Sequence, residues 1–157
     1  ERMDKVEAAK KILADIVYIT IATASQQGIP WNTPVYAAYD HQYTFYWVSA
    51  QTARHSQNIR EHNHVALVIY DSTVPEGTGE GVYIEAKAYE LTEHNDIDTA
   101  LRCLYGRKHV APRPSTAFTD ASPRRVYKAV PDKWWINGAG AFDGHSIDIR
   151  IEIDVTQ

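Results

Sequence analysis

The sequence contains a single cysteine, Cys103, which cannot form an internal disulfide. No Cys/His cluster has the spacing of a zinc site, so we expect a reducing compartment and, by default, the cytoplasm. Long hydrophobic runs are also missing, and none approaches the roughly 18 residues that a membrane span requires. Residues 1–14 are charged and predicted to be helical, so we expect neither export nor membrane insertion.

The chain has no excess of positive charge. Lys and Arg number 16 against 20 Asp and Glu, which gives a net charge of -4 and a pI near 6.0. Binding to nucleic-acid phosphates or to an anionic membrane surface therefore has no electrostatic support. Hydrophobic residues make up 44% and charged residues 23%, as in globular proteins, and 157 residues suit one domain over 1–157.

Short β-branched and aromatic runs predict a mainly β, antiparallel fold. The predicted strands are 17–24, 32–39, 43–49, 65–71, 82–91, 124–130, 133–137 and 146–155. Helices are predicted at 4–15, as a lid over the sheet, directly after Thr52, and at 96–105 with Gly106 as a stop. Closure or near-closure removes the edges of such a sheet, so we expect a small closed or split β-barrel with two or three peripheral helices.

The turn after the third predicted strand carries the most informative polar residues. Hydroxyl groups of Ser49, Thr52 and Ser56, the guanidinium of Arg54, the ring of His55 and free N–H groups of the following helix could converge on one phosphate. In the alternative interpretation Thr52 only caps the helix, and Arg54 and His55 are solvated polar residues. The spacing alone leaves both interpretations open.

Other candidate motifs are weaker. His62 and His64 are expected to point to opposite sides of an extended chain, and with Glu61 they match no metal-ligand pattern, so no metal site is predicted. Cys103 lies beside Leu101 and Leu104 and is interpreted as a small buried hydrophobic residue rather than a nucleophile. The sequence shows no catalytic dyad, and the catalytic residues stay unknown.

Six segments in order carry a family resemblance: TIATAS, GIPWNTPVY, FYWVS, TARHSQNI, HNHVALVIYD and VYIEAKAYEL. Over nearly the whole chain this order resembles the pyridoxamine 5'-phosphate oxidase-related family of FMN-binding split barrels. In that family a basic pair in the turn holds the FMN phosphate. Arg54 matches the first member, and His55 stands where lysine is common, which brings a hydrogen-bond donor but no full charge near neutral pH. Asn58-Ile59 matches the Asn-Leu that follows, and Asn63-His64 stands for Asn-Pro.

The resemblance also implies where the flavin ring lies. The second predicted strand would contact the ring through Asn32, Thr33, Pro34 and Val35. Independently of the resemblance, Pro34 is equally explained as an edge or bulge position.

Members of this family are usually homodimers with FMN at the interface. Trp135 and Asn137 resemble the late segment that reaches the flavin from the partner chain, and such an interface would use the high aromatic content of 11%. On the strand pattern alone, Trp134 and Trp135 are equally explained as one core and one rim residue.

The sequence departs from pyridoxamine 5'-phosphate oxidase itself after the late tryptophans. Residues 141–145 read Ala-Phe-Asp-Gly-His, where that enzyme has an Arg-x-His-x-Arg type motif. Because Asp143 would repel a second phosphate, we expect a small-molecule substrate other than pyridoxamine phosphate.

The resemblance implies an FMN-dependent oxidoreductase, in which the flavin carries the redox chemistry. The alternatives are a non-catalytic split barrel that binds flavin or haem, and a reductase that uses the deazaflavin F420. Haem requires a histidine ligand in an apolar pocket, and the seven histidines supply candidates.

Overall fold

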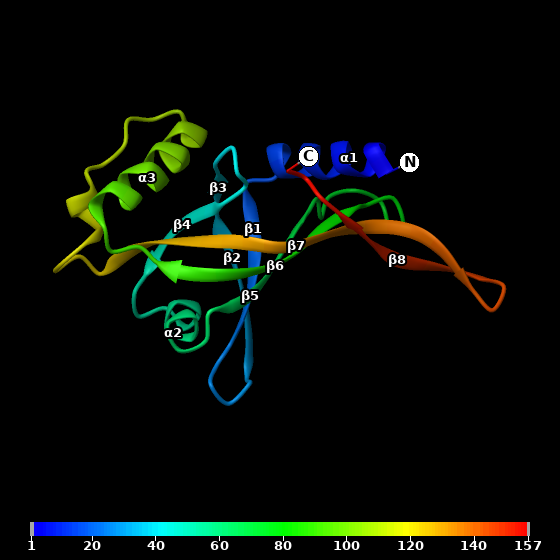
Figure 1. The fold of residues 1–157 in the computed structure, drawn as a ribbon, viewed down its shortest axis with the longest axis horizontal. Helices are drawn as coiled ribbons and strands as arrows, with labels where there is room; N and C mark the ends of the chain where they lie inside the picture. The colour runs from blue at the N-terminus through cyan, green and yellow to red at the C-terminus, as the bar shows by residue number, and fades with distance from the viewer. Residues whose placement is uncertain (1, 157) are drawn as a thin grey trace.

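The computed structural model describes residues 2–156, which form one antiparallel sheet of eight strands and three α-helices. The strands are β1 (Tyr18–Ala24), β2 (Pro30–Tyr36), β3 (Ala38–Tyr39), β4 (Phe45–Ala50), β5 (His64–Tyr70), β6 (Gly81–Glu90), β7 (Arg124–Phe142) and β8 (His145–Ile153). Their order is β2-β1-β5-β6-β7-β4-β3, with β8 paired to β7 (Figure 1). Within the described residues no pairing joins β2 to β3, so the sheet is not closed and the split-barrel prediction is confirmed.

Alternation along the strands separates an inner face from an outer face. Strand β1 buries Ile19 and Ile21, and β5 buries Leu67 and Ile69, because successive side chains of a strand point to opposite faces. The inner residues form one continuous core around the fully buried Trp47. The outer face keeps smaller or aromatic residues, and several of them are exposed: Tyr18, Ala22, Ala66 and Tyr70.

Helix α1 (Arg2–Asp15) belongs to the core rather than lying over it as a lid. Val6, Ala9 and Leu13 are buried in the main hydrophobic cluster. Helix α3 (His94–Lys108) packs with a 3-10 turn (Ser115–Phe118) in a second cluster. Among the described residues no helix has the length and apolar composition needed to cross a membrane.

Two predicted boundaries are wrong for identifiable reasons. Strand β7 continues through Pro131, because Asp132 is an unpaired extra residue in a bulge opposite Glu85 and Ala86. Helix α3 passes through Gly106 and continues to Lys108. His109 caps its carboxyl end with a left-handed φ of 59°.

A smaller difference concerns the second predicted strand. The predicted strand 32–39 divides into β2 and β3 on either side of Ala37.

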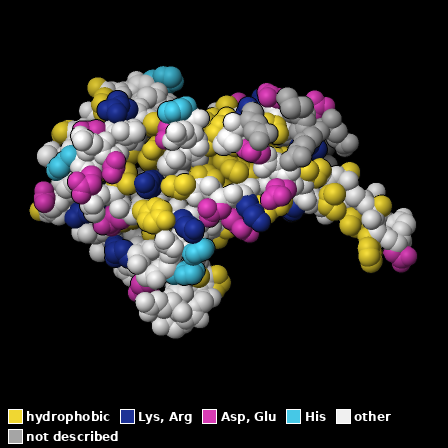
Figure 2. All heavy atoms as spheres, in the orientation of Figure 1, with side chains coloured by type: hydrophobic (Ala, Val, Ile, Leu, Met, Phe, Trp, Pro, Cys, Tyr) yellow, Lys and Arg dark blue, Asp and Glu magenta, His cyan; other side chains and the backbone are white. Residues whose placement is uncertain are grey.

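The β7–β8 arm (residues 138–149) extends away from the rest of the sheet (Figure 1). Residues 141–148 are all exposed, with Phe142 at 72% and Ile147 at 41%. Hydrophobic side chains follow the arm in the space-filling view (Figure 2). A two-stranded ribbon is only marginally stable by itself, so this arm leaves apolar area without a covering layer in the single chain.

Arg107 joins α3 to the carboxyl end of α1. Its guanidinium donates to the carbonyl groups of Ala37 at 3.1 Å, Leu13 at 2.8 Å, Ala14 at 3.1 Å and Ile16 at 3.2 Å. These carbonyl groups include the last ones of α1, which have no partner inside the helix. One side chain therefore joins α3 to α1 and to the turn before β3.

We expect Arg107→Ala to lower the free energy of unfolding by about 2–3 kcal/mol, because charge-assisted hydrogen bonds are lost and carbonyl groups are left unpaired. Urea unfolding followed by circular dichroism measures the change. Arg102→Ala is the matched control, since Arg102 is exposed and donates only to Thr99, and it should change stability by no more than about 0.5 kcal/mol. An equal effect of both substitutions would contradict this role of Arg107.

Candidate functional site

Helix α2 (Arg54–Glu61) is anchored near its amino end by buried polar side chains. Ser56 Oγ donates to the Ala50 carbonyl at 2.8 Å, and Asn58 Nδ2 donates to Thr23 Oγ1 at 3.0 Å. Ser56, Asn58 and Thr23 are all buried, so water does not compete for these bonds. The anchoring fixes the amino end of α2 against β1 and β4.

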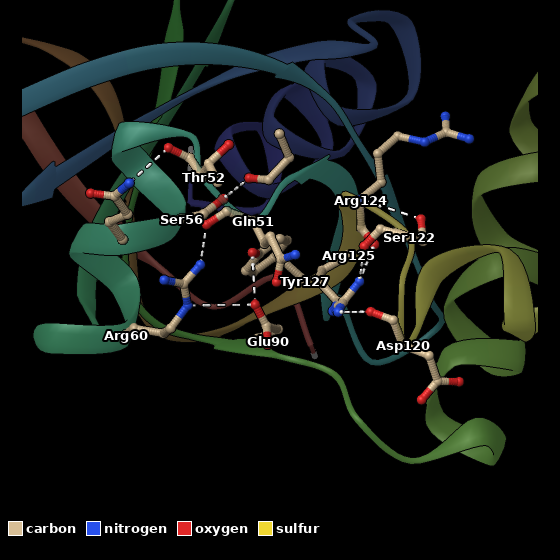
Figure 3. A network of polar contacts seen from close by, with 12 residues as sticks. Gln51, Thr52, Ser56, Arg60, Glu90, Asp120, Ser122, Arg124, Arg125 and Tyr127 are labelled. Atoms are coloured by element: carbon tan, nitrogen blue, oxygen red, sulfur yellow. Dashed lines mark hydrogen bonds and ion pairs between the residues drawn. The ribbon is translucent and has the colours of Figure 1, made fainter.

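The carboxyl end of α2 is held by a second set of contacts (Figure 3). Arg60 donates to the Gln51 carbonyl and lies 3.6 Å from Glu90, whose carboxylate also accepts the Tyr127 hydroxyl at 2.9 Å. On the neighbouring strand, Arg125 donates only to backbone carbonyl groups. The guanidinium groups of Arg60 and Arg125 are therefore already used within the fold.

The predicted side-chain cap of α2 is absent. Ala53 is the capping residue and makes no side-chain hydrogen bond, whereas exposed Thr52 accepts from Gln57 through its carbonyl at 2.8 Å. The first N–H groups of a helix have no partner inside it, and none of the described residues accepts from those of Arg54, His55 and Ser56. The amino end of α2 is thus an open set of backbone donors.

Ser49 and His55 bond to each other rather than to solvent. His55 Nε2 and Ser49 Oγ are 2.8 Å apart, and His55 is only 8% exposed. Burial lowers the pKa of His55 below its usual value, because the charged imidazolium is desolvated. Together with Ser56, whose hydroxyl is occupied by Ala50, these side chains shape the turn, and of the predicted phosphate-binding side chains Thr52 and Arg54 stay accessible.

Arg54 is the accessible cation beside this turn. Its guanidinium carbon lies 4.6 Å from the centroid of the Trp31 ring, and no carboxylate of the described residues pairs with it. A positive guanidinium next to free helix N–H groups is the arrangement that binds a phosphate group.

Strand β2 is an edge strand of the sheet, which explains Pro34. The Ser25 N–H donates to the Ile29 carbonyl, and the Ala37 N–H donates to the Val17 carbonyl. Backbone hydrogen bonds to β1 therefore come from the odd-numbered residues of β2, and the backbone groups of the even-numbered residues point away from β1. The backbone of Pro34 therefore faces the open edge, where no ladder hydrogen bond is lost.

The four β2 residues predicted to contact the flavin ring are placed differently from one another. Asn32 and Pro34 are exposed and turn backbone groups to the open edge, whereas the Val35 side chain is buried in the core and is unavailable to a ligand. Thr33 is half-buried, and its backbone pairs with Ile21 of β1.

Trp135 and Asn137 lie at a second location, on the outer face of β7. Trp135 lines a cavity of about 370 Å³ together with Tyr83 and Arg150. The Arg150 guanidinium lies 4.2 Å from the Tyr83 ring centroid and 2.6 Å from an Asp148 oxygen. Asn137 accepts from the Gly81 N–H at 2.6 Å and donates to Asp148 at 2.9 Å, so it orders this surface.

The two groups of predicted site residues are far apart within one chain. Ser49 pairs with Arg125 near the start of β7, and Trp135 lies ten residues further along the same strand. At about 3.3 Å per residue this is roughly 33 Å of strand. A single copy therefore does not bring Trp135 to the amino end of α2.

Several residues near these two groups are not predicted from the sequence. Trp31 lies next to the predicted Asn32, and its role beside Arg54 is visible only from the packing of β2 against α2. Arg150 and Asp148 belong to an alternating strand whose charged side chains indicate only a solvated face.

One prediction about the histidines is wrong. The rings of His62 and His64 stack at a centroid distance of 5.3 Å, because residues two apart in an extended chain point to the same side.

The family model described as pyridoxamine 5'-phosphate oxidase matches residues 6–138. The chain belongs to this family. No curated protein matches the sequence.

Solved structures resemble this member of the pyridoxamine 5'-phosphate oxidase family at low identity. A haem-binding protein from Mycobacterium smegmatis superposes with a TM-score of 0.68 at 16% identity, covering 93% of this chain and 57% of that protein. The haem storage protein HutZ from Vibrio cholerae gives 0.60 at 12%, covering 78% and 87%. An F420 reductase gives 0.59 at 16%, covering 80% and 94%. Superpositions at such low identity show that the fold is shared and nothing further.

The buried His55 predicts a pH-dependent stability for this family member. Its folded pKa lies below the value of about 6.5 expected in the unfolded chain, so below that pH the unfolded chain binds the proton more readily. We expect the free energy of unfolding to fall as the pH drops from 7 toward 5. His55→Gln keeps a donor near Ser49 but does not titrate, so it should flatten the profile measured by urea unfolding. His41→Gln, at an exposed histidine, is the control, and an unchanged His55→Gln profile would contradict the assignment.

Proposed function

We propose that this chain binds FMN through a phosphate site at the amino end of α2 and acts as an FMN-dependent oxidoreductase. The observation that carries the proposal is the Arg54 guanidinium, which pairs with no carboxylate of residues 2–156, beside the open N–H groups of α2. A terminal phosphate is a dianion, and it suits a site with one full positive charge and the positive end of a helix.

The residues present fit the rest of FMN as well. The N–H of Asn32 and the carbonyl of Pro34 face the open edge of β2, where they can hydrogen-bond to the edge of a flat ring system. When bound, FMN supplies the redox chemistry. The chain itself orients the ring along β2 and holds the phosphate with Arg54, while Trp135 of a partner copy excludes water from one side of the pocket.

The substrate that this arrangement favours is a small molecule without a phosphate group. The β7–β8 arm (residues 138–149) contains no Lys or Arg, and Asp143 is exposed at its tip. A phosphate requires charge-assisted donors, so pyridoxamine phosphate is a poor match for this surface.

Haem and F420 are the competing ligands. The lining of the apolar cavity beside Trp135 includes no histidine, which speaks against a haem ligand from within that cavity. The longer charged tail of F420 would need further cations, whereas Arg60 and Arg125 are occupied by other contacts. The absorption spectrum of the purified protein decides: flavin bands support the proposal, and a Soret band would replace it with haem binding.

The complete site needs two copies of the chain. Arg54 and Trp135 lie at separate parts of one copy, whereas exposed Ala22, Ala66 and Tyr70 leave the outer face of the sheet uncovered. We propose a homodimer, associated through these outer faces, in which Trp135 of the partner completes the pocket beside Arg54. The pocket then forms at the interface, and residues from both copies enclose the ring.

We expect Arg54→Ala to weaken FMN binding by about 1.5–3 kcal/mol, the value of a hydrogen bond to a charged group. Titration of the apoprotein with FMN, followed by quenching of flavin fluorescence, gives the affinity. Arg102→Ala removes an exposed arginine from α3 and should leave the affinity unchanged. Unchanged affinity in Arg54→Ala would remove Arg54 from the site.

The shared pocket predicts complementation between two defective variants. Arg54→Ala and Trp135→Ala homodimers should each bind FMN weakly. After subunit exchange, about a quarter of the sites should regain wild-type affinity, since half of the dimers are mixed and each mixed dimer holds one intact site. Equilibrium dialysis counts these sites. No recovery on mixing, with exchange verified by tagged subunits, would contradict a pocket built from both copies.

A further inference from the structure

We infer that Trp31 is a positioning residue, which holds the Arg54 guanidinium in the orientation that receives the ligand phosphate. The inference rests on the proposed function and deepens it, because it assigns a second residue to the same site. The turn motif does not include Trp31, and the family resemblance assigns the flavin contacts of this segment to residues 32–35.

The contact between the two side chains is direct. The Arg54 guanidinium carbon lies 4.6 Å from the Trp31 ring centroid, well within the range of a cation–π interaction. Trp31 is 40% exposed and packs into neither core cluster. Its indole face is covered by Arg54 instead.

The fold fixes both partners of this pair. Asn58 of α2 donates to Thr23 Oγ1, and that hydroxyl lies 3.5 Å from the Trp31 carbonyl. Thr23 and Trp31 are also direct partners in the β1–β2 register. The buried bond that docks α2 therefore sets the position of the Trp31 backbone, and with it the distance from the indole to Arg54.

The contact with the Trp31 ring orients the Arg54 guanidinium and leaves its N–H donors available for a ligand. An arginine on an aromatic face keeps its N–H groups in the guanidinium plane free to bind an anion bidentately. A long exposed side chain otherwise loses rotamer freedom when a ligand binds. Because Trp31 already restricts the Arg54 side chain in the folded protein, part of this conformational entropy is lost on folding and is not lost again when a ligand binds.

The experiment compares FMN with riboflavin, which has the same ring and lacks the phosphate. Fluorescence titration gives the affinity of wild type, Trp31→Ala and Trp31→Phe for both flavins. We expect Trp31→Ala to weaken FMN binding about two- to five-fold, as for an exposed cation–π contact, and to leave riboflavin binding unchanged. Trp31→Phe keeps an aromatic face and should restore part of the loss. In an Arg54→Ala background, Trp31→Ala should have no further effect.

Tyr89→Ala is the matched control for removal of an exposed aromatic residue. Tyr89 is 39% exposed and carries the Lys128 ammonium 5.8 Å from its ring centroid, yet it lies outside the proposed site. It should leave the affinity for both flavins at the wild-type value.

Three results would overturn the inference. Equal weakening of FMN and riboflavin in Trp31→Ala would mean that Trp31 touches the ring or maintains the fold. A loss of affinity in Arg54→Ala without one in Trp31→Ala would leave the phosphate site standing and remove Trp31 from it. No FMN binding by wild type would overturn the proposed function together with this inference.

Discussion

The buried hydrogen bond between Asn58 and Thr23 is the contact on which the geometry of the α2 region depends. It joins an eight-residue helix, too short to be stable alone, to the first strand of the sheet. Ser56 fixes the same helix to the end of β4. With two buried anchors of this kind, the amino end of α2 has one position relative to β2. Arg54 and the open N–H groups then lie beside the same turn, and no acceptor among the described residues bonds to either.

The length of β7 separates the two groups of proposed site residues within one chain. Its first half pairs with β4 and supports the turn beside α2, whereas its second half carries Trp135 and continues into the β7–β8 arm. A strand of nineteen residues cannot bring its two halves to one pocket. In the proposed dimer, one copy would contribute the phosphate site and the other would contribute Trp135.

Most of the sheet could be predicted from the sequence, because apolar alternation and β-branched runs report directly on burial. The site could be predicted only in part. Accessible Arg54 is where the family resemblance puts a cation, but the absence of a Thr52 cap and the burial of Ser56 depend on how the turn folds back on β4. The sequence offers no signal for the bulge that carries β7 past Pro131, nor for the contact of Trp31 with α2. Both arise from pairing between distant segments.

The two ends of the open sheet limit how copies of the chain can associate. At one end, Pro30 and Pro34 both occupy positions whose backbone nitrogen faces outward, so half of the outward-facing positions of β2 lack a donor. At the other end, β3 is only two residues long. Neither end offers a full row of backbone donors and acceptors to an added strand, which disfavours sheet extension at these two edges. Association is thereby directed to the sheet faces and to the arm, where β8 pairs with β7 along one side and adds a backbone edge to the exposed apolar side chains.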